Sequence, residues 1–404
     1  MQTKFIKLGT AISSAVLVAA SFLTPALALD VTISGNGASS ESEVKVEHNS
    51  DVDVDQSNDA DIDNDVDIDQ DTGGNKADWN TGGDVSVESG DASSDVTISN
   101  IANANTAEVS ACCPGGDVEV TIKDNGAFSD NKVELKNDSD VDLDQDNDAD
   151  FDNDVDVDQD SGDNKANNNT NGDVSVTSGD IHSSVTVDNM ANVNSARLTG
   201  SSDPATLSVL IAGNGAQSEN EVEIDNDSDV DLDQDNDADF DNDVDVDQDS
   251  GDNKAKWNTG GEVSIEGGDV DSTVDISNIA NFNWADLDAC GCAFDEDSTL
   301  TIKDNGAFSD NDFELKTDSD VDADQDNDAD FDNDADVDQD TGDNKVKGST
   351  ATGDPAITSG DASSSTTVEN EGNSNVLNGE VDLELPADLG ELVDLLSALL
   401  ALLS

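Results

Sequence analysis

Residues 138–160 read DSDVDLDQDNDADFDNDVDVDQD, with aspartate at twelve consecutive even-numbered positions. The alternation returns at Asp227–Asp249 and Asp318–Asp340, and in a looser form at Asp51–Asp71, where Ser57 interrupts it. A period of two is typical of an extended strand, because successive side chains point to opposite faces. On a helix the same aspartates would surround the whole cylinder. We therefore expect each run to be a β-strand with a carboxylate face and a face of aliphatic and amide side chains.

The residues between the aspartates predict what the buried face contains. In the run at 138–160 they are mainly Val, Leu, Ala and Phe, interrupted by Gln145, Asn147, Asn153 and Gln159. Amide side chains can stack on copies of themselves and satisfy one another's hydrogen bonds. We expect these amides to point inward at the corners of a repetitive β structure.

The composition limits the fold and the partners. The formal net charge is -81, from 96 acidic and 15 basic residues, and this field excludes nucleic acid and anionic membrane surfaces as partners by repulsion. The chain has no Tyr, and aromatic residues make up 3% of it, too few to fill thick globular cores. Disorder and a thin repetitive β structure both fit such a composition. Strict alternation favours the ordered alternative, on condition that cations are bound.

The chain contains four copies of one unit. The tripeptide Asn-Gly-Ala begins at Asn36, Asn125, Asn214 and Asn305, so the copies are 89, 89 and 91 residues apart. We expect a signal peptide at 1–28, repeats at 29–110, 111–199, 200–289 and 290–383, and an apolar C-terminal helix at 384–404. Turn residues recur often enough for about seven short strands per unit.

Two all-β architectures fit these repeats. One is a β-solenoid in which each unit forms several coils and like residues stack in ladders. The alternative is a row of Ig-like or cadherin-like β-sandwiches, whose usual length is close to that of the unit. The scarcity of core aromatics and the inward amides favour the solenoid.

The end of the second aspartate run, Gln159-Asp160-Ser161-Gly162-Asp163-Asn164-Lys165-Ala166, resembles the curlin repeat, in which Gln is followed by Gly, Asn and Ala. The same positions recur as Gln70, Asn75, Ala77, as Gln248, Asn253, Ala255, and as Gln339, Asn344, Val346. The chain is also similar to bacterial cell-surface repeats rich in Asp, Asn and Gly. Curlins form cross-β solenoids that polymerise into fibres, so the resemblance implies a fibre-forming component of the cell surface or extracellular matrix.

The carboxylate face predicts bound divalent cations, with calcium foremost and several ions per chain. Two like charges 5 Å apart repel by about 3 kcal/mol at an effective dielectric constant of 20. The runs match neither the EF-hand loop, because Gly162 stands seventh instead of sixth, nor the RTX nonapeptide. A solvated acidic surface that only keeps the protein soluble is the alternative. The candidate ligands are Asp67, Asp69, Asp71, Asp156, Asp158, Asp160, Asp163, Asp245, Asp247, Asp249, Asp252, Asp336, Asp338, Asp340 and Asp343.

The N-terminus has the features of a secretory signal peptide. Lys4 and Lys7 precede the apolar stretch Leu8–Leu23, and Ala26-Leu27-Ala28 is an Ala-x-Ala cleavage site. The protein is therefore expected to be secreted or attached to the cell surface, where calcium is abundant.

Four cysteines lie in the connections before repeats, as Cys112, Cys113, Cys290 and Cys292. The pairs are too far apart in sequence for a simple zinc motif, and disulfides are the default in an exported chain. Their connectivity stays open. The segment Leu392–Leu403 predicts an apolar helix that either caps the last coil or anchors the protein to a surface.

Catalysis is not predicted. His48 and His182 occupy non-equivalent positions in the repeats, and no pair of carboxylates stands out as an acid and a base. Two functions remain. The first is an exported, calcium-stabilised structural or adhesive protein, with divalent cations, surface partners or other copies of itself as partners. The second is a soluble acidic protein that binds a mineral or ice lattice.

Overall fold

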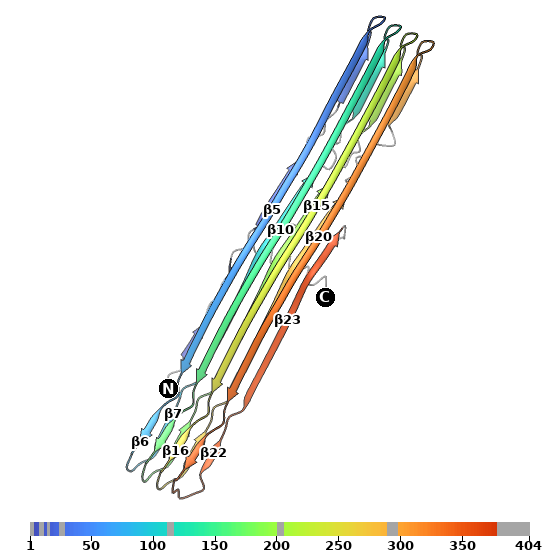
Figure 1. Cartoon of the computed structure of the whole chain (residues 1–404). Helices are drawn as coiled ribbons and strands as arrows, with labels where there is room; N and C mark the ends of the chain where they lie inside the picture. The colour runs from blue at the N-terminus through green and yellow to red at the C-terminus, as the bar shows by residue number, and fades with distance from the viewer. Residues whose placement is uncertain are drawn as a thin grey trace.

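The computed structural model describes residues 4–7, 12–13, 17–23, 29–110, 117–199, 206–288 and 298–377. Regular structure in these ranges is all strand, with no helix among them. The strands stack in parallel as a long β-solenoid of four coils (Figure 1). The predicted solenoid is confirmed, and the row of separate sandwiches is excluded because every repeat pairs with the next along its length.

Each coil has five strands in the same order. The first contains β4 (Leu29–Ser34), β5 (Glu41–Asp71), β6 (Lys76–Asp78), β7 (Val85–Glu88) and β8 (Ala92–Ser110). The second contains β9 (Val118–Lys123), β10 (Asp130–Asp160), β11 (Lys165–Asn167), β12 (Val174–Thr177) and β13 (Ile181–Thr199). The third contains β14 (Leu207–Ala212), β15 (Glu219–Asp249), β16 (Lys254–Lys256), β17 (Val263–Glu266) and β18 (Val270–Asp288). The fourth contains β19 (Thr299–Lys303), β20 (Asp310–Asp340), β21 (Lys345–Lys347), β22 (Ala356–Thr358) and β23 (Ala362–Leu377).

One repeat makes one coil, not several, and it holds five strands instead of about seven. Each aspartate run is the C-terminal part of a single 31-residue strand. The strand is continuous because β5, β10, β15 and β20 contain no Gly or Pro that would turn the chain. The four long strands pair in register, so that Asp140 lies between Asp51 and Asp229. The rings of Phe151 and Phe240 stack with centroids 4.8 Å apart, the usual distance between paired strands.

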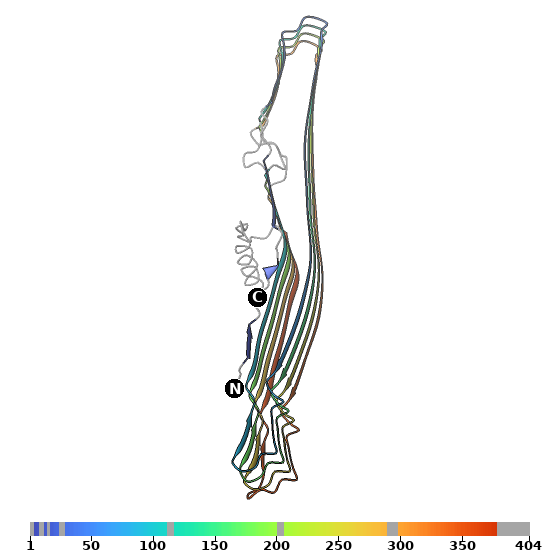
Figure 2. The same cartoon turned by 90° about the vertical axis from the view of Figure 1, so that its left-hand side faces the viewer.

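The core lies between two layers, which Figure 2 shows on edge. One is the sheet of long strands, in the order β20-β15-β10-β5, and the other contains the return strands β8, β13, β18 and β23. Apolar clusters alternate along the core with polar ladders. One cluster joins Val155 and Val157 of β10 to Val185 and Val187 of β13. The thin core explains how so few aromatic residues suffice.

The inward amides form ladders through the core. Asn147 donates from Nδ2 to Oδ1 of Asn236 in the next coil at 3.0 Å, and accepts from Asn58 in the preceding coil at 2.9 Å. It also donates across the core to Asn194 at 2.7 Å. These amides lie within the long strands and not at the corners as we expected. They can do so because each finds a copy of itself one coil away, so that no buried amide depends on solvent at a turn.

Three further strands pair with the outer edge of β8. They are β1 (Lys4–Lys7), β2 (Ile12–Ser13) and β3 (Leu17–Leu23), all parallel to β8. Among the described residues no helix is long and apolar enough to cross a membrane. The four cysteines and the predicted helix at 384–404 lie outside the described residues.

Candidate cation-binding face

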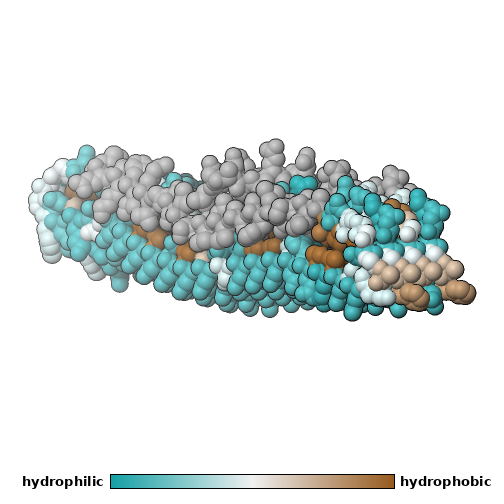
Figure 3. All heavy atoms as spheres, turned by 90° about the horizontal axis from the view of Figure 1, so that it is seen from above, coloured by the Kyte–Doolittle hydropathy of each residue, from teal (hydrophilic) through white to brown (hydrophobic). Residues whose placement is uncertain are grey.

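The outward aspartates of β5, β10, β15 and β20 form one surface, which we call the carboxylate face. Inward residues of β10 between Ser139 and Gln159 are buried, and the aspartates alternating with them mostly face solvent. Because the strands pair in register, aspartates of successive coils align in columns. In Figure 3 hydrophilic residues (teal) run in regular rows along this side of the solenoid.

The spacing of this face follows from strand geometry. Successive outward carboxylates are about 6.6 Å apart along a strand and about 4.8 Å apart between coils. The sequence offers no basic residue from Ser139 to Asn164 to offset this charge. At the start of the run Lys136 Nζ lies 3.3 Å from Asp138 Oδ2. An aspartate inside the array therefore has like charges on all four sides.

The crowding of charge raises the affinity of the face for protons. Burial, and after it the charges of Asp156 and Asp336, raise the pKa of Asp245. The pKa of Asp247 is raised by burial and by Asp158 and Asp338 in the neighbouring coils. A bound metal cation would reduce the repulsion between these carboxylates, as a bound proton does.

The donor atoms fit a hard cation such as calcium, since every one is a carboxylate oxygen. No group of three or more acidic, His or Cys side chains in the described ranges converges on one point as a ready-made metal site. The carboxylates instead stand in parallel columns. Such an arrangement can hold cations between adjacent coils, each ion bridging carboxylates of two strands.

The predicted ligands assemble into the end of this face. Three columns cross all four coils: Asp67, Asp156, Asp245 and Asp336; Asp69, Asp158, Asp247 and Asp338; and Asp71, Asp160, Asp249 and Asp340. The sequence pattern thus identifies residues that are 89 to 91 positions apart in the sequence and that the fold brings together.

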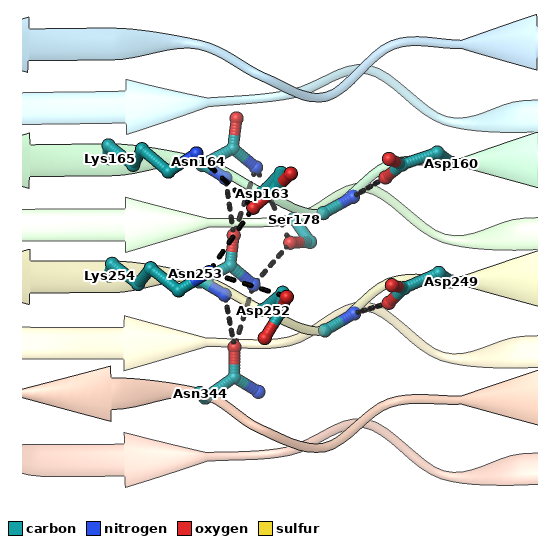
Figure 4. A network of polar contacts seen from close by, with 12 residues as sticks. Asp160, Asp163, Asn164, Lys165, Ser178, Asp249, Asp252, Asn253, Lys254 and Asn344 are labelled. Atoms are coloured by element: carbon teal, nitrogen blue, oxygen red, sulfur yellow. Dashed lines mark hydrogen bonds and ion pairs between the residues drawn. The ribbon is translucent and has the colours of Figure 1, made fainter.

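Carboxylates of the last column also accept hydrogen bonds from the turn that follows it (Figure 4). Oδ1 of Asp160 accepts a hydrogen bond from the backbone N–H of Gly162 at 2.6 Å. Burial raises the pKa of Asp160 to about 6, although this hydrogen bond opposes the shift. Gly162 must be glycine, because a Cβ there would lie 2.1 Å from the carbonyl oxygen of Gly251. The tight stacking of these turns fixes the carboxylate at the end of the run.

Two of the three predicted ligands after the turn, Asp163 and Asp252, have lysine partners, and the third, Asp343, stays a prediction. Asp163 Oδ1 lies 3.3 Å from Nζ of Lys165 and 3.4 Å from Nζ of Lys254 (Figure 4). Burial acts to raise the pKa of Asp163, but the hydrogen bonds and charges of the two lysines outweigh it and lower the pKa. Asp252 similarly lies 3.3 Å from Lys254. A cation at these positions would compete with lysine, and their role as ligands stays a prediction.

A further group of aspartates was not singled out from the sequence. An open hollow of about 540 Å³ is lined by Phe331 and by Asp150, Asp152, Asp239, Asp241, Asp330 and Asp332. The alternation contains these aspartates, but it does not reveal the hollow. The hollow forms where the ring of Phe331 is inclined by 55° to that of Phe240, unlike the parallel pair below it.

Comparison with family models, curated proteins and solved structures finds no match to this chain. The curlin resemblance stays a prediction. His182 lies on β13 with Nδ1 3.5 Å from Asp271, and His48 lies on β5. The absence of catalysis likewise stays a prediction.

Proposed function

We propose that this protein is an exported structural or adhesive component of the cell surface or extracellular matrix, whose fold is stabilised by calcium. The observation that carries this proposal is the alignment of like aspartates in columns through four coils. The folded chain concentrates a charge that the unfolded chain spreads out. Cations that bind only the folded state therefore favour folding.

The energetic argument is one of linkage. Each site that binds calcium only in the folded state adds about 2.7 kcal/mol at a calcium concentration a hundredfold above its Kd. Several such sites would offset the repulsion within the face. Weak sites suffice outside the cell, since extracellular calcium modules work with Kd values of about 10⁻⁴–10⁻³ M.

The shape of the molecule supports a structural role. The long solenoid presents the same side chains at regular intervals along two directions (Figures 1 and 3). A repetitive surface of this kind is suited to many weak contacts made together, whose combined affinity exceeds that of each contact. We therefore place the protein in the matrix or on the cell surface, where such contacts hold assemblies together.

The flat array of carboxylates also favours a second candidate function, binding to a mineral that contains calcium. Here the aspartates would meet cations of the crystal instead of dissolved ions. Calcium carbonate growth in the presence of the purified chain tests this candidate. Inhibition by the parent that disappears when aspartates of the face are changed to asparagine would support it.

The main proposal is tested on intact cells that produce the protein. We expect protease added outside the cells to degrade it, and a calcium chelator to release it or increase that degradation. An equal ionic strength of sodium chloride is the control and should have far less effect. Protection from external protease with and without chelator would contradict the proposal.

A further inference from the structure

The two ends of the solenoid are unequal, and the fourth coil exposes apolar side chains that equivalent coils bury. Val321 is 44% exposed and Ile302 is 45% exposed. Their partners in the third coil, Val230 and Ile211, are fully buried at 0%. The large apolar residues of the last coil that are exposed where the third coil buries its equivalents are Leu300, Ile302, Leu315, Val321, Ile357, Val368 and Leu377. We call this surface the coil-4 edge.

The coil-4 edge matches the surface that each earlier coil offers to its successor. Among the described strands, β20 pairs only with β15, so none of them covers its other side. At the opposite end, β10 is likewise the only described strand that pairs with β5. An exposed strand edge of this kind is a template for another strand. The first coil carries the same columns of inward residues, so it has the right pattern to continue the stack.

Three columns carry opposite charges at the two ends of the solenoid, whereas the columns from Glu41 to Asp310, from Glu43 to Asp312 and from Lys76 to Lys345 carry like charges. One column reads Glu47, Lys136, Asp225, Lys316, with alternating sign, and would next meet Glu47 of a following copy. Its two lysines pair with carboxylates beside the column, Lys136 with Asp138 of its own strand and Lys316 with Glu223 of the adjacent column.

Two more columns begin and end in opposite charges. In the first, Lys45 begins a column that ends at Glu314, so a following copy would set lysine against glutamate. Within the chain Lys45 Nζ already lies 2.8 Å from Glu134, its neighbour in the next coil. In the second, Asp78 begins a column that ends at Lys347. Three columns therefore place opposite charges together where the fourth coil of one copy meets the first coil of another.

We propose that the coil-4 edge binds the first coil of a second copy of this chain, in the register of the internal repeats, so that the solenoid continues from molecule to molecule. This inference rests on the proposed function, because the aspartate columns also continue across the junction and need the same cations there. Ser57 stands where the other coils have aspartate, which removes one like-charge contact at the junction.

The N-terminal segment determines when this contact can form. The strands β1, β2 and β3 occupy the outer edge of β8, where the return strand β23 of a preceding copy would pair. They belong to the predicted signal peptide. We therefore expect the chain that begins at Leu29 to stack, and the chain that retains residues 1–28 to stack at least tenfold more weakly.

Engineered cysteines test the register. Ser57→Cys and Asp326→Cys lie at opposite ends of one column, and at the junction their Cα atoms would be about 4.8 Å apart, within reach of a disulfide. Asp61→Cys with Asp326→Cys is the matched control, displaced by about 13 Å along the strand. Each single variant measures background cross-linking from the native cysteines.

The experiment uses the chain from Leu29 in millimolar calcium, with diamide as oxidant and non-reducing electrophoresis as readout. We expect a series of cross-linked oligomers from the in-register pair, and only background from the control. A folded chain that sediments as a monomer in calcium would overturn stacking and leave the calcium-stabilised fold standing. In that case the edge is covered by another occupant, such as the chain's own segment 392–403. Failure to fold in calcium would instead contradict the proposed function.

Charge reversal gives an independent test. A chain with Glu314→Lys and Lys316→Glu keeps its net charge but presents the wrong charges at the coil-4 edge, and should not assemble alone. A chain with Lys45→Glu and Glu47→Lys should also fail alone. An equimolar mixture of the two should assemble, since each altered end then meets a complementary partner. Two folded chains that assemble alone as well as the parent would overturn the inference.

Discussion

Replacing Asp245, Asp247 and Asp249 together by asparagine should make the metal-free chain easier to fold and reduce the number of bound calcium ions. The three aspartates lie at the end of the carboxylate face on the inner strand β15, between aspartates of β10 and β20. Asparagine keeps the shape of the side chain and removes its charge. It also introduces amides that can hydrogen-bond to the carboxylates on either side.

The magnitude follows from the register. Each of the three residues faces one aspartate in the coil before and one in the coil after, which makes six cross-coil pairs. A pair of charges about 5 Å apart repels by about 0.8 kcal/mol in water. The variant should therefore gain roughly 5 kcal/mol of folding free energy in the absence of divalent cations, before salt screening reduces it.

A matched variant controls for the loss of three charges as such. Asp271, Asp275 and Asp286 lie on β18 of the same coil, and their neighbours on β13 are His182, Thr186 and Arg197. Changing these three to asparagine removes no pair of carboxylates that face each other in register, although Asp275 has a carboxylate nearby in the preceding coil, that of Asp188. We expect no gain in stability and no loss of bound ions.

The assays are circular dichroism in chelator at increasing sodium chloride, and calcium titration by calorimetry. The triple variant of the face should fold at lower salt than the parent and bind fewer calcium ions. If it binds as many ions as the parent, and needs as much salt to fold in chelator, the aspartates of the face do not bind cations and the reasoning fails.

Three further changes test the core and the charge of the face. Phe240→Asp places a carboxylate against the ring of Phe151, and an unpaired buried charge typically costs about 3–5 kcal/mol, so cooperative thermal unfolding in calcium should be lost; an unchanged melting temperature would show that this position is not packed. Asn147→Ala removes the buried hydrogen bonds that Asn147 makes with Asn58, Asn194 and Asn236, and denaturant titration should show a loss of about 1–3 kcal/mol in unfolding free energy, unless the ladder is dispensable. In chelator, protonation of the carboxylates at acid pH should stabilise the fold in place of bound calcium. Burial raises the pKa of Asp160 to about 6 from its ordinary value of 3.8, so its contribution to stability is full below about 3.8 and is lost as the pH rises through about 6. Circular dichroism should therefore show more strand at pH 4 than at pH 7.5, and equal or lower strand content at pH 4 would contradict the predicted charge repulsion.

The alternation of aspartate predicted the long strands and which side of each is buried. Period two determines orientation within a strand, and this is why the inward positions of Val155 and Phe240 follow from sequence alone. The pattern does not determine which strands become neighbours. That depends on where the chain turns, and the turns at Gly162 and its equivalents bring each repeat back onto the previous one after a single coil.

The candidate site was predicted in part for the same reason. The sequence named the aspartates that form three of its columns, because residues at equal places in equal repeats meet in a solenoid, and their role as ligands stays a prediction. The contact of Asp163 with Lys254 could not be predicted, since it joins an aspartate of one coil to a lysine of the next coil. The inclination of Phe331, whose ring lines the hollow, leaves no trace in the repeat itself, since Phe151 and Phe240 stand at the same place and stack in parallel.

Calcium titration of the chain from Leu29, followed by far-ultraviolet circular dichroism at neutral pH and low ionic strength, tests the central claim most directly. We predict a disordered spectrum in chelator that changes to a β spectrum in millimolar calcium and returns on chelation. Sodium chloride at equal ionic strength should be much less effective. A β spectrum of full strength that persists in chelator would contradict the claim that cations bound to the carboxylate face stabilise the fold.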